Sequence, residues 1–418
     1  MNSIPGEKLR RRLQRLKDAG LITAGNQIKK APAPGGLLQF FPGEEREEVT
    51  PKGTCLVRET AFPLDYRHGS VALEEARECS AAALRLLMQH PPCEKTEPWN
   101  GLFLDLETTG LAGGTGTWAF LLGVGWVDDH RFRIRQYFLR QPSEEQAMLW
   151  HFTRSFQHVK TLITFNGKSF DLPLVNTRQV LTKVLPPLTP STHIDLLHCA
   201  RRLWKERLPS CSLQSLEQHL LTLTREGDIP GEEIPAVYFD FLRRGETARL
   251  KQVFEHNCLD LLTMAALLGL MGKIKKEDFL EDALPQDCYS LGLLFDRAGE
   301  VEKAEVFLQH AYKYGSSSSG LQKKALSALG FLYKRLGDWE KSVFCWKRLV
   351  QEGERDLTAY LELAKLYEHR LKDFPEALRM TRLALDAALK RRQMGGCPTE
   401  ISQVRHRLQR LEKKAGHL

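Results

Sequence analysis

The sequence contains no apolar run approaching the ~18–20 residues that a membrane-spanning helix needs. The longest candidate, Met264–Met271, is far too short, and the N-terminus is basic where a secretory signal would be apolar. The nine cysteines are scattered and form no C-x-x-C pair, so neither a zinc ribbon nor a disulfide framework is expected. These absences predict a cytoplasmic protein that does not bind a membrane.

The 418 residues are enough for two or three domains, at about 150 residues per domain. Apolar residues make up 42% of the chain, enough for a sizeable core. The net charge of +8 is concentrated at the ends: residues 1–30 and 390–418 each carry +6, so the rest carries −4. Basic ends around a mildly acidic body indicate contact with a polyanion, although solvated helical faces would give the same pattern.

Apolar periodicity, turn residues and charge divide the chain into five segments. They are a basic helix with a flexible linker (1–52), an N-terminal preamble (53–99), an α/β domain (100–275), helical repeats (285–388) and a basic C-terminal tail (389–418). In the α/β domain, three strands connected as hairpins precede an alternation of helix, strand and helix. This order predicts one mixed sheet flanked by helices, followed by an all-α domain.

The helical segment contains an internal repeat. A short motif recurs at spacings of 38 and 34 residues, as Leu291-Gly292-x-x-Phe295, Leu329-Gly330-x-x-Tyr333 and Leu363-Ala364-x-x-Tyr367. It resembles the tetratricopeptide repeat, in which a helix pair recurs about every 34 residues. The resemblance implies stacked helix pairs with a concave surface for a protein partner. An unrelated helical bundle is the alternative.

Two carboxylates stand on a short strand that is otherwise apolar. Alternate strand residues point to the same face, so Asp105 and Glu107 project together while Leu106 enters the core. Two like charges this close repel each other and are tolerated mainly when a cation lies between them. D-x-E is a common tripeptide, and the end of a solvent-facing strand would also accommodate it.

Three further polar residues follow in the same domain. Asp171 stands at the start of a predicted helix, shortly after a strand that ends at Asn166, and the helix dipole favours a carboxylate there. His256 and Asp260 are four residues apart on a long apolar helix and therefore share one face. Each has an ordinary structural explanation when taken alone. Together with the acid pair they form an ordered set of four acids and one histidine.

This set resembles the DnaQ-like 3′–5′ exonucleases, which have a ribonuclease H-like fold and four DEDD carboxylates. With the helical repeats, the whole chain resembles bacterial DEDD exonucleases of the mitomycin-repair type. The resemblance implies catalytic acids that hold two divalent cations, Mg²⁺ or Mn²⁺, namely Asp105, Glu107, Asp171 and Asp260. It also implies that His256 is catalytic and that the terminal nucleotide is contacted by Thr108, Thr109 and Asn166.

One departure concerns His256. The histidine subclass of these exonucleases usually places its histidine five residues before the final aspartate, whereas the spacing to Asp260 is four, as in the tyrosine subclass. His256 is either the general base at a helically equivalent position or a residue that only steadies a water. Asp195 is a rival fifth acid, and we interpret it as structural because the four-carboxylate set is complete without it.

The sequence therefore predicts a metal-dependent 3′–5′ exonuclease that hydrolyses DNA in DNA repair and binds a protein partner, such as a helicase, through its repeats. A 3′–5′ exonuclease of the same fold that acts on RNA is the close alternative. A non-catalytic adaptor is another, but an inert pocket gains nothing from clustered carboxylates. An endonuclease of the same fold is a further alternative.

Overall fold

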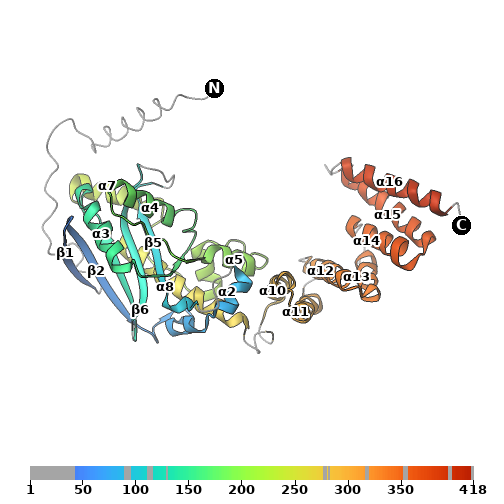
Figure 1. Cartoon of the computed structure of the whole chain (residues 1–418), viewed down its shortest axis with the longest axis horizontal. Coiled ribbons are helices and arrows are strands. Elements are labelled where there is room, and N and C mark those ends of the chain that lie inside the picture. Colours follow the sequence, from blue (N-terminus) through green and yellow to red (C-terminus); the bar gives the residue numbers. More distant parts are fainter. Residues whose placement is uncertain are drawn as a thin grey trace, which may run out of the picture. The chain divides into compact units, whose positions relative to one another are not determined.

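The computed structural model describes residues 43–88, 96–110, 116–128, 130–275, 280, 283–315, 320–351, 356–393 and 398–415. The chain divides into two compact units (Figure 1). The first comprises residues 1–199 and 210–274, and the second residues 200–209 and 275–418. The basic helix predicted within residues 1–30 lies outside the described residues.

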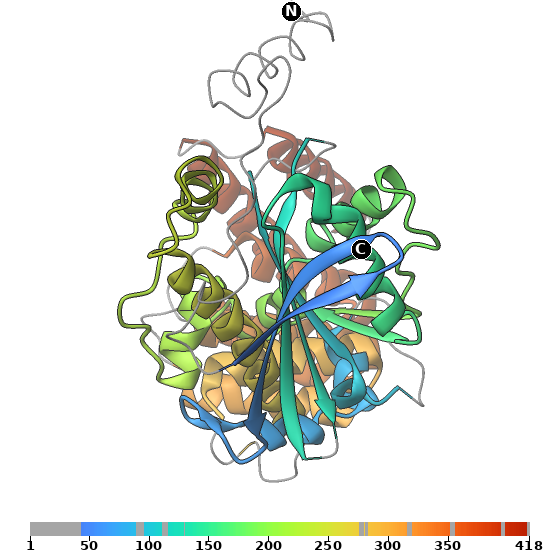
Figure 2. The same ribbon diagram turned by 90° about the vertical axis from the view of Figure 1, so that its left-hand side faces the viewer.

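A seven-stranded sheet forms the centre of the first unit. Its order is β1 (Glu44–Thr50), β2 (Gly53–Pro63), β7 (Arg131–Phe138), β6 (Ala119–Asp128), β5 (Leu102–Thr108), β8 (Thr161–Thr164) and β9 (Thr192–Asp195). Neighbours from β1 to β5 are antiparallel, and β8 and β9 continue the sheet parallel to β5. Figure 2 shows the twist of these strands. The mixed sheet predicted from the sequence is confirmed.

The prediction of a flexible linker up to residue 52 is wrong for residues 44–50, which form the edge strand β1. Its acidic side chains have cationic neighbours: Glu48 pairs with Arg46 at 2.5 Å, and Glu47 pairs with Arg140 at 2.6 Å. Charged side chains are a common way to protect an exposed sheet edge from pairing with other chains. The acidic composition that indicates a linker therefore suits an edge strand equally well.

The preamble predicted at 53–99 is part of the α/β domain rather than a separate segment. Its strand β2 pairs with β7 from Leu56 to Pro63. Beyond a small hairpin of β3 (Arg67–His68) and β4 (Val71–Ala72), the 3₁₀ helix η1 (Leu73–Glu78) packs on α8 (Leu250–Gly272), and α2 (Ala81–Leu87) follows. A Cβ on Gly272 would lie 2.6 Å from the Cys79 nitrogen, so this contact is close. These pairings link residues too distant in sequence for a local pattern to show.

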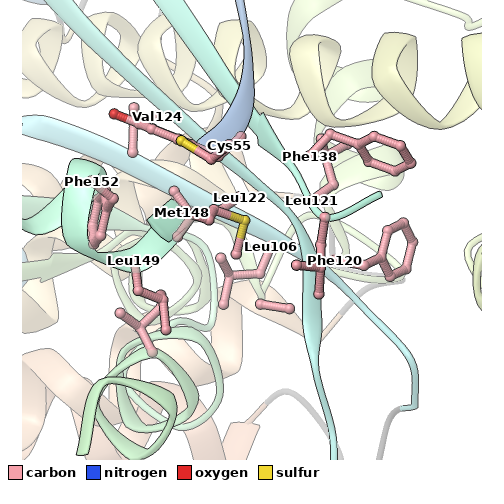
Figure 3. Packing of buried hydrophobic residues seen from close by; sticks show 14 of the residues in the cluster. Cys55, Leu106, Phe120, Leu121, Leu122, Val124, Phe138, Met148, Leu149 and Phe152 are labelled. Atoms are coloured by element: carbon pink, nitrogen blue, oxygen red, sulfur yellow. The ribbon is translucent and has the colours of Figure 1, made fainter. Parts of the chain in front are cut away.

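Helices cover both faces of the sheet. On one face, Met148 and Leu149 of α3 (Glu145–Phe156) pack with Leu106 and Leu122 (Figure 3). Alternate residues of the same strands face α8 on the other side, because strand side chains alternate between faces. The other helices of the α/β domain are α4 (Asp171–Leu181), α5 (Leu196–Trp204), α6 (Leu213–Leu216), the π-helical turn η4 (Glu217–Leu221) and α7 (Ile234–Arg244).

Helix α8 is the one helix in the described ranges whose length and composition would allow it to cross a membrane. In this fold 72% of its most apolar window is buried inside the protein. It packs against β5, β6 and η1. Packing on the sheet therefore accounts for its apolar composition.

The second unit is all-helical from residue 283 onward, as predicted. Its helices are α10 (Pro285–Ala298), α11 (Val301–Tyr314), α12 (Leu321–Leu336), α13 (Trp339–Gln351), α14 (Leu357–Leu366) with the π-helical turn η7 (Tyr367–Leu371), α15 (Phe374–Gln393) and α16 (Pro398–Ala415). The glycines of the repeat motif lie where helices touch. A Cβ on Gly292 would lie 2.7 Å from Leu308, and one on Gly330 would lie 2.6 Å from Trp346. The repeat spacing thus reflects helix pairs in close contact.

The basic tail predicted at 389–418 is helical wherever it is described. Helix α15 continues to Gln393, and α16 packs against it through Ile401, Val404 and Leu411, each at most 2% exposed. These apolar positions are spaced for one helical face, but the many basic residues between them obscure the pattern. The described part of the tail therefore belongs to the last two helices of the helical unit.

Candidate active site

The acid pair lies at the end of the central strand β5. Asp105 is opposite Gly123 of β6, and Glu107 is opposite Leu121. The register shifts between Glu107 and Thr108, which ends the regular pairing at this point. Irregularities of this kind re-aim side chains and are frequent beside active sites. Strand alternation puts both carboxylates on the face covered by α8.

Helix α8 touches the sheet at Gly123. A Cβ there would lie 2.1 Å from the side-chain oxygen of Asn257, so any larger residue would displace this amide. Asn257 is fully buried; its Nδ2 donates to Oδ2 of Asp105 at 2.8 Å, and its Oδ1 accepts from Gln136 at 2.9 Å. A single buried amide therefore orients Asp105 and sets how closely α8 approaches β5 and β6.

Asp171 is the first residue of α4, as predicted, and is buried. The backbone N–H groups of Leu106 and of Asp171 itself favour its charged form, although burial outweighs them. Leu106 lies between the two acids of β5, so the Asp171 carboxylate lies close to that strand. Three carboxylates from two elements thus meet at one end of the sheet.

Burial and mutual repulsion raise the pKa values of these carboxyls. Burial first, and then the charge of Asp260, raise the pKa of Asp105 to about 7. Burial and the carboxylates of Asp105, Asp260 and Asp171 hold the pKa of Glu107 well above its ordinary value. Burial and Asp105 do the same for Asp171. The structure therefore brings all four predicted acids into one electrostatic cluster.

His256 faces the cluster from α8 and is oriented by an acid that the sequence did not single out. Its Nδ1 lies 2.9 Å and 3.1 Å from the two oxygens of Asp228. A carboxylate only accepts, so Nδ1 carries the hydrogen and the neutral ring keeps Nε2 as an acceptor. Nε2 lies 3.7 Å from Oδ2 of Asp260. Burial lowers the pKa of His256, but the hydrogen bond that it donates to Asp228 and the charges of Asp260 and Asp228 outweigh burial and raise that pKa.

Arg225 connects Asp260 to the rest of the domain. Its Nη2 donates to Asp260 at 2.5 Å, its Nη1 to Asp228 at 3.3 Å and its Nε to Glu217 at 2.9 Å. Glu217 is 1% exposed and begins the π-helical turn η4. It also accepts from Thr263 of α8 at 2.5 Å. Turns of this type often mark functional sites, and here the turn supplies the buried anion that holds Arg225.

The predicted substrate contacts lie at the rim of the cluster. The Thr108 hydroxyl donates to the Gly110 carbonyl at 3.1 Å, and the Thr109 hydroxyl accepts from the Trp118 N–H at 3.0 Å. Asn166 is exposed with a left-handed backbone, φ 65°. Asp195 accepts the backbone N–H groups of Asn166 at 2.9 Å and Lys168 at 3.1 Å. Through these bonds Asp195 holds the backbone turn that follows β8.

The donor set suits a hard divalent cation. Within the described ranges, no group of three His, Cys, Asp or Glu side chains could hold a metal ion as it stands. The chemistry fits nevertheless, because the acids of β5, α4 and α8 offer only carboxylate oxygens and already repel one another. Arg225 pairs with Asp260 alone among the four. Asp105, Glu107 and Asp171 are therefore the acids that most need a cation.

Four residues of this site were not predicted from the sequence: Glu217, Arg225, Asp228 and Asn257. Asn257 could have been found, because a polar residue on an apolar helix beside His256 needs a partner. Arg225 and Asp228 lie between η4 and α7 in a stretch with no helical or strand pattern. Only the folded chain brings them to α8.

The fold and this carboxylate cluster define the class of the protein. Residues 102–271 match the family model of the RNase_H superfamily, a range that runs from β5 to α8. The chain therefore contains an RNase_H superfamily domain in this range. It is also 32% identical over 418 residues to the protein named "Uncharacterized protein YprB" of Bacillus subtilis (strain 168), and the alignment covers 97% of this chain and 99% of that protein. The chain belongs to the same family as that relative, helical unit included.

Proposed function

We propose that the chain is a metal-dependent 3′–5′ exonuclease that hydrolyses DNA and acts in DNA repair. Its superfamily indicates a nuclease-type hydrolase. The observation that carries the proposal is the buried carboxylate cluster, whose members raise one another's pKa values. Such a cluster is costly without cations, and its oxygen donors select Mg²⁺ or Mn²⁺.

In this proposal the metal ligands are Asp105, Glu107, Asp171 and Asp260. Bound Mg²⁺ or Mn²⁺ ions would supply activation of a water and stabilisation of the leaving oxygen. His256 takes the proton of the attacking water at Nε2. Asp228 holds the ring through Nδ1 and stabilises the imidazolium that forms.

The chain end is held beside the cluster in the same proposal. Thr108 at the end of β5 and Thr109 just after it contact the terminal nucleotide, and Asn166 does so from the turn that follows β8. The Thr108 hydroxyl already donates to the Gly110 carbonyl. Among the described residues the Thr109 hydroxyl only accepts, so its hydrogen is free to donate to the nucleotide, whereas the Thr109 N–H is bonded to the Trp118 carbonyl. The exposure of Asn166 leaves its side-chain amide accessible to a strand.

The test is digestion of end-labelled oligonucleotides in Mg²⁺ or Mn²⁺. A DNA strand blocked at its 3′ end should resist digestion, a 5′ block should have no effect, and a closed circle should stay intact. Asp105→Asn is the inactive control. Cleavage of the circle would instead favour an endonuclease, and preference for RNA would favour the ribonuclease alternative. No product from any substrate would favour the non-catalytic adaptor.

A protein partner of the helical repeats, such as a helicase, stays a prediction. Unpairing a duplex costs about 1.4 kcal/mol per base-pair step, so an exonuclease that needs a frayed 3′ end benefits from a strand-opening partner. The corresponding measurement compares digestion of blunt duplex with digestion of duplex carrying a 3′ overhang. Much slower digestion of the blunt duplex is expected.

A further inference from the structure

Two adjoining hollows in the second unit are each lined by several basic side chains, and one of them also by aromatic rings. One, of ≈ 610 Å³, lies among residues of α12, α13, α14, η7 and α16. The other, also ≈ 610 Å³, lies among residues of α14, α15 and α16. Lys365 and Arg407 line both. The two hollows therefore form one basic groove that follows the last helices of the stack.

The cations of the basic groove outnumber the acids that pair with them. Seven lysine and arginine side chains line it. They pair with four carboxylates: Glu362, Glu368, Asp296 and Glu400. Glu362 accepts from both Lys334 and Lys365, and Glu368 from both Arg407 and Arg410. A net charge of +3 is left, and it attracts a polyanion.

Arg370 is a cation of the basic groove that is available to bind a ligand anion. In the part of the chain that the structure describes, no carboxylate pairs with it, and its guanidinium lies over the ring of Trp339, 4.4 Å from the centroid. The side chain is exposed. Stacking on an aromatic ring orients a guanidinium while its N–H groups remain free to donate. Phe331 is 43% exposed in the same hollow.

We infer that the basic groove binds single-stranded nucleic acid, with phosphates on its cations and bases against Trp339 and Phe331. Proteins that bind single strands combine a positive groove with rings on which bases stack. A duplex keeps its bases stacked, and an acidic peptide uses the charge but not the rings. The inference rests on the proposed function only in taking the strand to be the substrate of the nuclease.

The test measures binding by the full chain without catalysis. Fluorescein-labelled (dT)30 is titrated with protein in EDTA, and anisotropy is recorded at several salt concentrations. The groove variant carries Lys365→Gln, Arg370→Glu and Arg410→Gln. It leaves each buried glutamate a cationic partner, Lys334 for Glu362 and Arg407 for Glu368. A thermal melt verifies that the variant is folded.

A matched control removes the same charge elsewhere in the helical unit. It carries Lys303→Gln, Arg379→Glu and Lys390→Gln, three exposed cations that pair with acids on their own helices or caps and do not line the groove. At 100 mM salt we expect the groove variant to bind at least tenfold more weakly and the control within twofold of wild type. Because the groove variant neutralises three fewer phosphates, its slope of log affinity against log salt should be shallower by about 2.

Trp339→Ala separates stacking from charge. It should weaken (dT)30 binding by roughly 5-fold to 100-fold, the range expected for loss of one stacked base. Binding of a polyglutamate of equal length should not change. Equal weakening by the groove variant and the control would overturn the inference, as would competition by polyglutamate as effective as that of unlabelled (dT)30. Failure of wild type to digest any strand in Mg²⁺ or Mn²⁺ would overturn the proposed function and leave the binding result standing.

Discussion

Asn257 donates a 2.8 Å hydrogen bond to Asp105 across 152 positions of sequence. The same amide lies against Gly123, where there is no room for a Cβ. The contact joins the sheet to α8, which carries His256 and Asp260. The spacing of these two elements therefore sets the geometry of the site.

Gly123→Ala should separate α8 from the sheet. Overpacking of this kind costs about 1–3 kcal/mol of folding stability, and here it also displaces the partner of Asp105. We expect a lower thermal midpoint and at least tenfold weaker Mg²⁺ binding, measured by titration of the thermal shift. Gly125→Ala is the matched control, because its Cβ would meet the ring of Phe132 at 2.7 Å and the Cβ of Phe103 at 3.5 Å but not Asn257. If both variants bound Mg²⁺ like wild type, the spacing would not matter.

Neutral replacements in the cluster should abolish nucleotide release. For Glu107→Gln and Asp171→Asn the metal-free protein should melt at the same or a higher temperature, because one of several repelling charges is removed. Asp260→Asn should not gain stability, since it takes a partner from Arg225. Asp240→Asn, a change of an exposed acid on α7, is the control. Wild-type turnover in two of the cluster variants would refute the two-metal proposal.

Metal-free stability should fall as pH rises. The folded carboxyls of Asp105, Glu107 and Asp171 have raised pKa values, so between about pH 4 and pH 7 the native state binds more protons than the unfolded chain. Unfolding free energy then decreases with pH across this window. Thermal melts in EDTA from pH 5 to pH 8 should show the decline, and Mg²⁺ should reverse it. If the melting temperature of the double variant Asp105→Asn/Asp171→Asn did not change with pH, the decline in the wild type would be caused by the cluster.

Asp228→Asn should lower turnover by roughly 10²–10⁴-fold, the usual contribution of a positioned general base. The asparagine can bond Nδ1 but provides no charge for the imidazolium. KM should change little, and His256→Gln combined with Asp228→Asn should be no worse than His256→Gln alone. Single-turnover rates check this directly. If Asp228→Asn turned over within twofold of wild type, His256 would serve only to steady a water.

Local patterns in the sequence predict the strands, the start of α4 and the face shared by His256 and Asp260, because each depends on residues a few positions apart. They miss what depends on pairing over long distances. Residues 44–50 carry a linker-like composition and become a strand only through β2. Arg225 and Asp228 belong to no periodic element, and their roles arise from contact with α8. Many basic residues separate the apolar positions of α16, so its buried face becomes evident only from its packing against α15.

The bond from Asn257 to Asp105 also bears on when the protein becomes active during synthesis. Strand β5 leaves the ribosome more than 140 residues before α8, and domains form only after their distant segments are available. Until Asn257 and Asp260 are made, the acids of β5 lack the helix that completes their cluster. A ribosome-bound chain of fewer than about 260 residues is thus expected to be inert toward nucleic acid, including the message from which it is being translated.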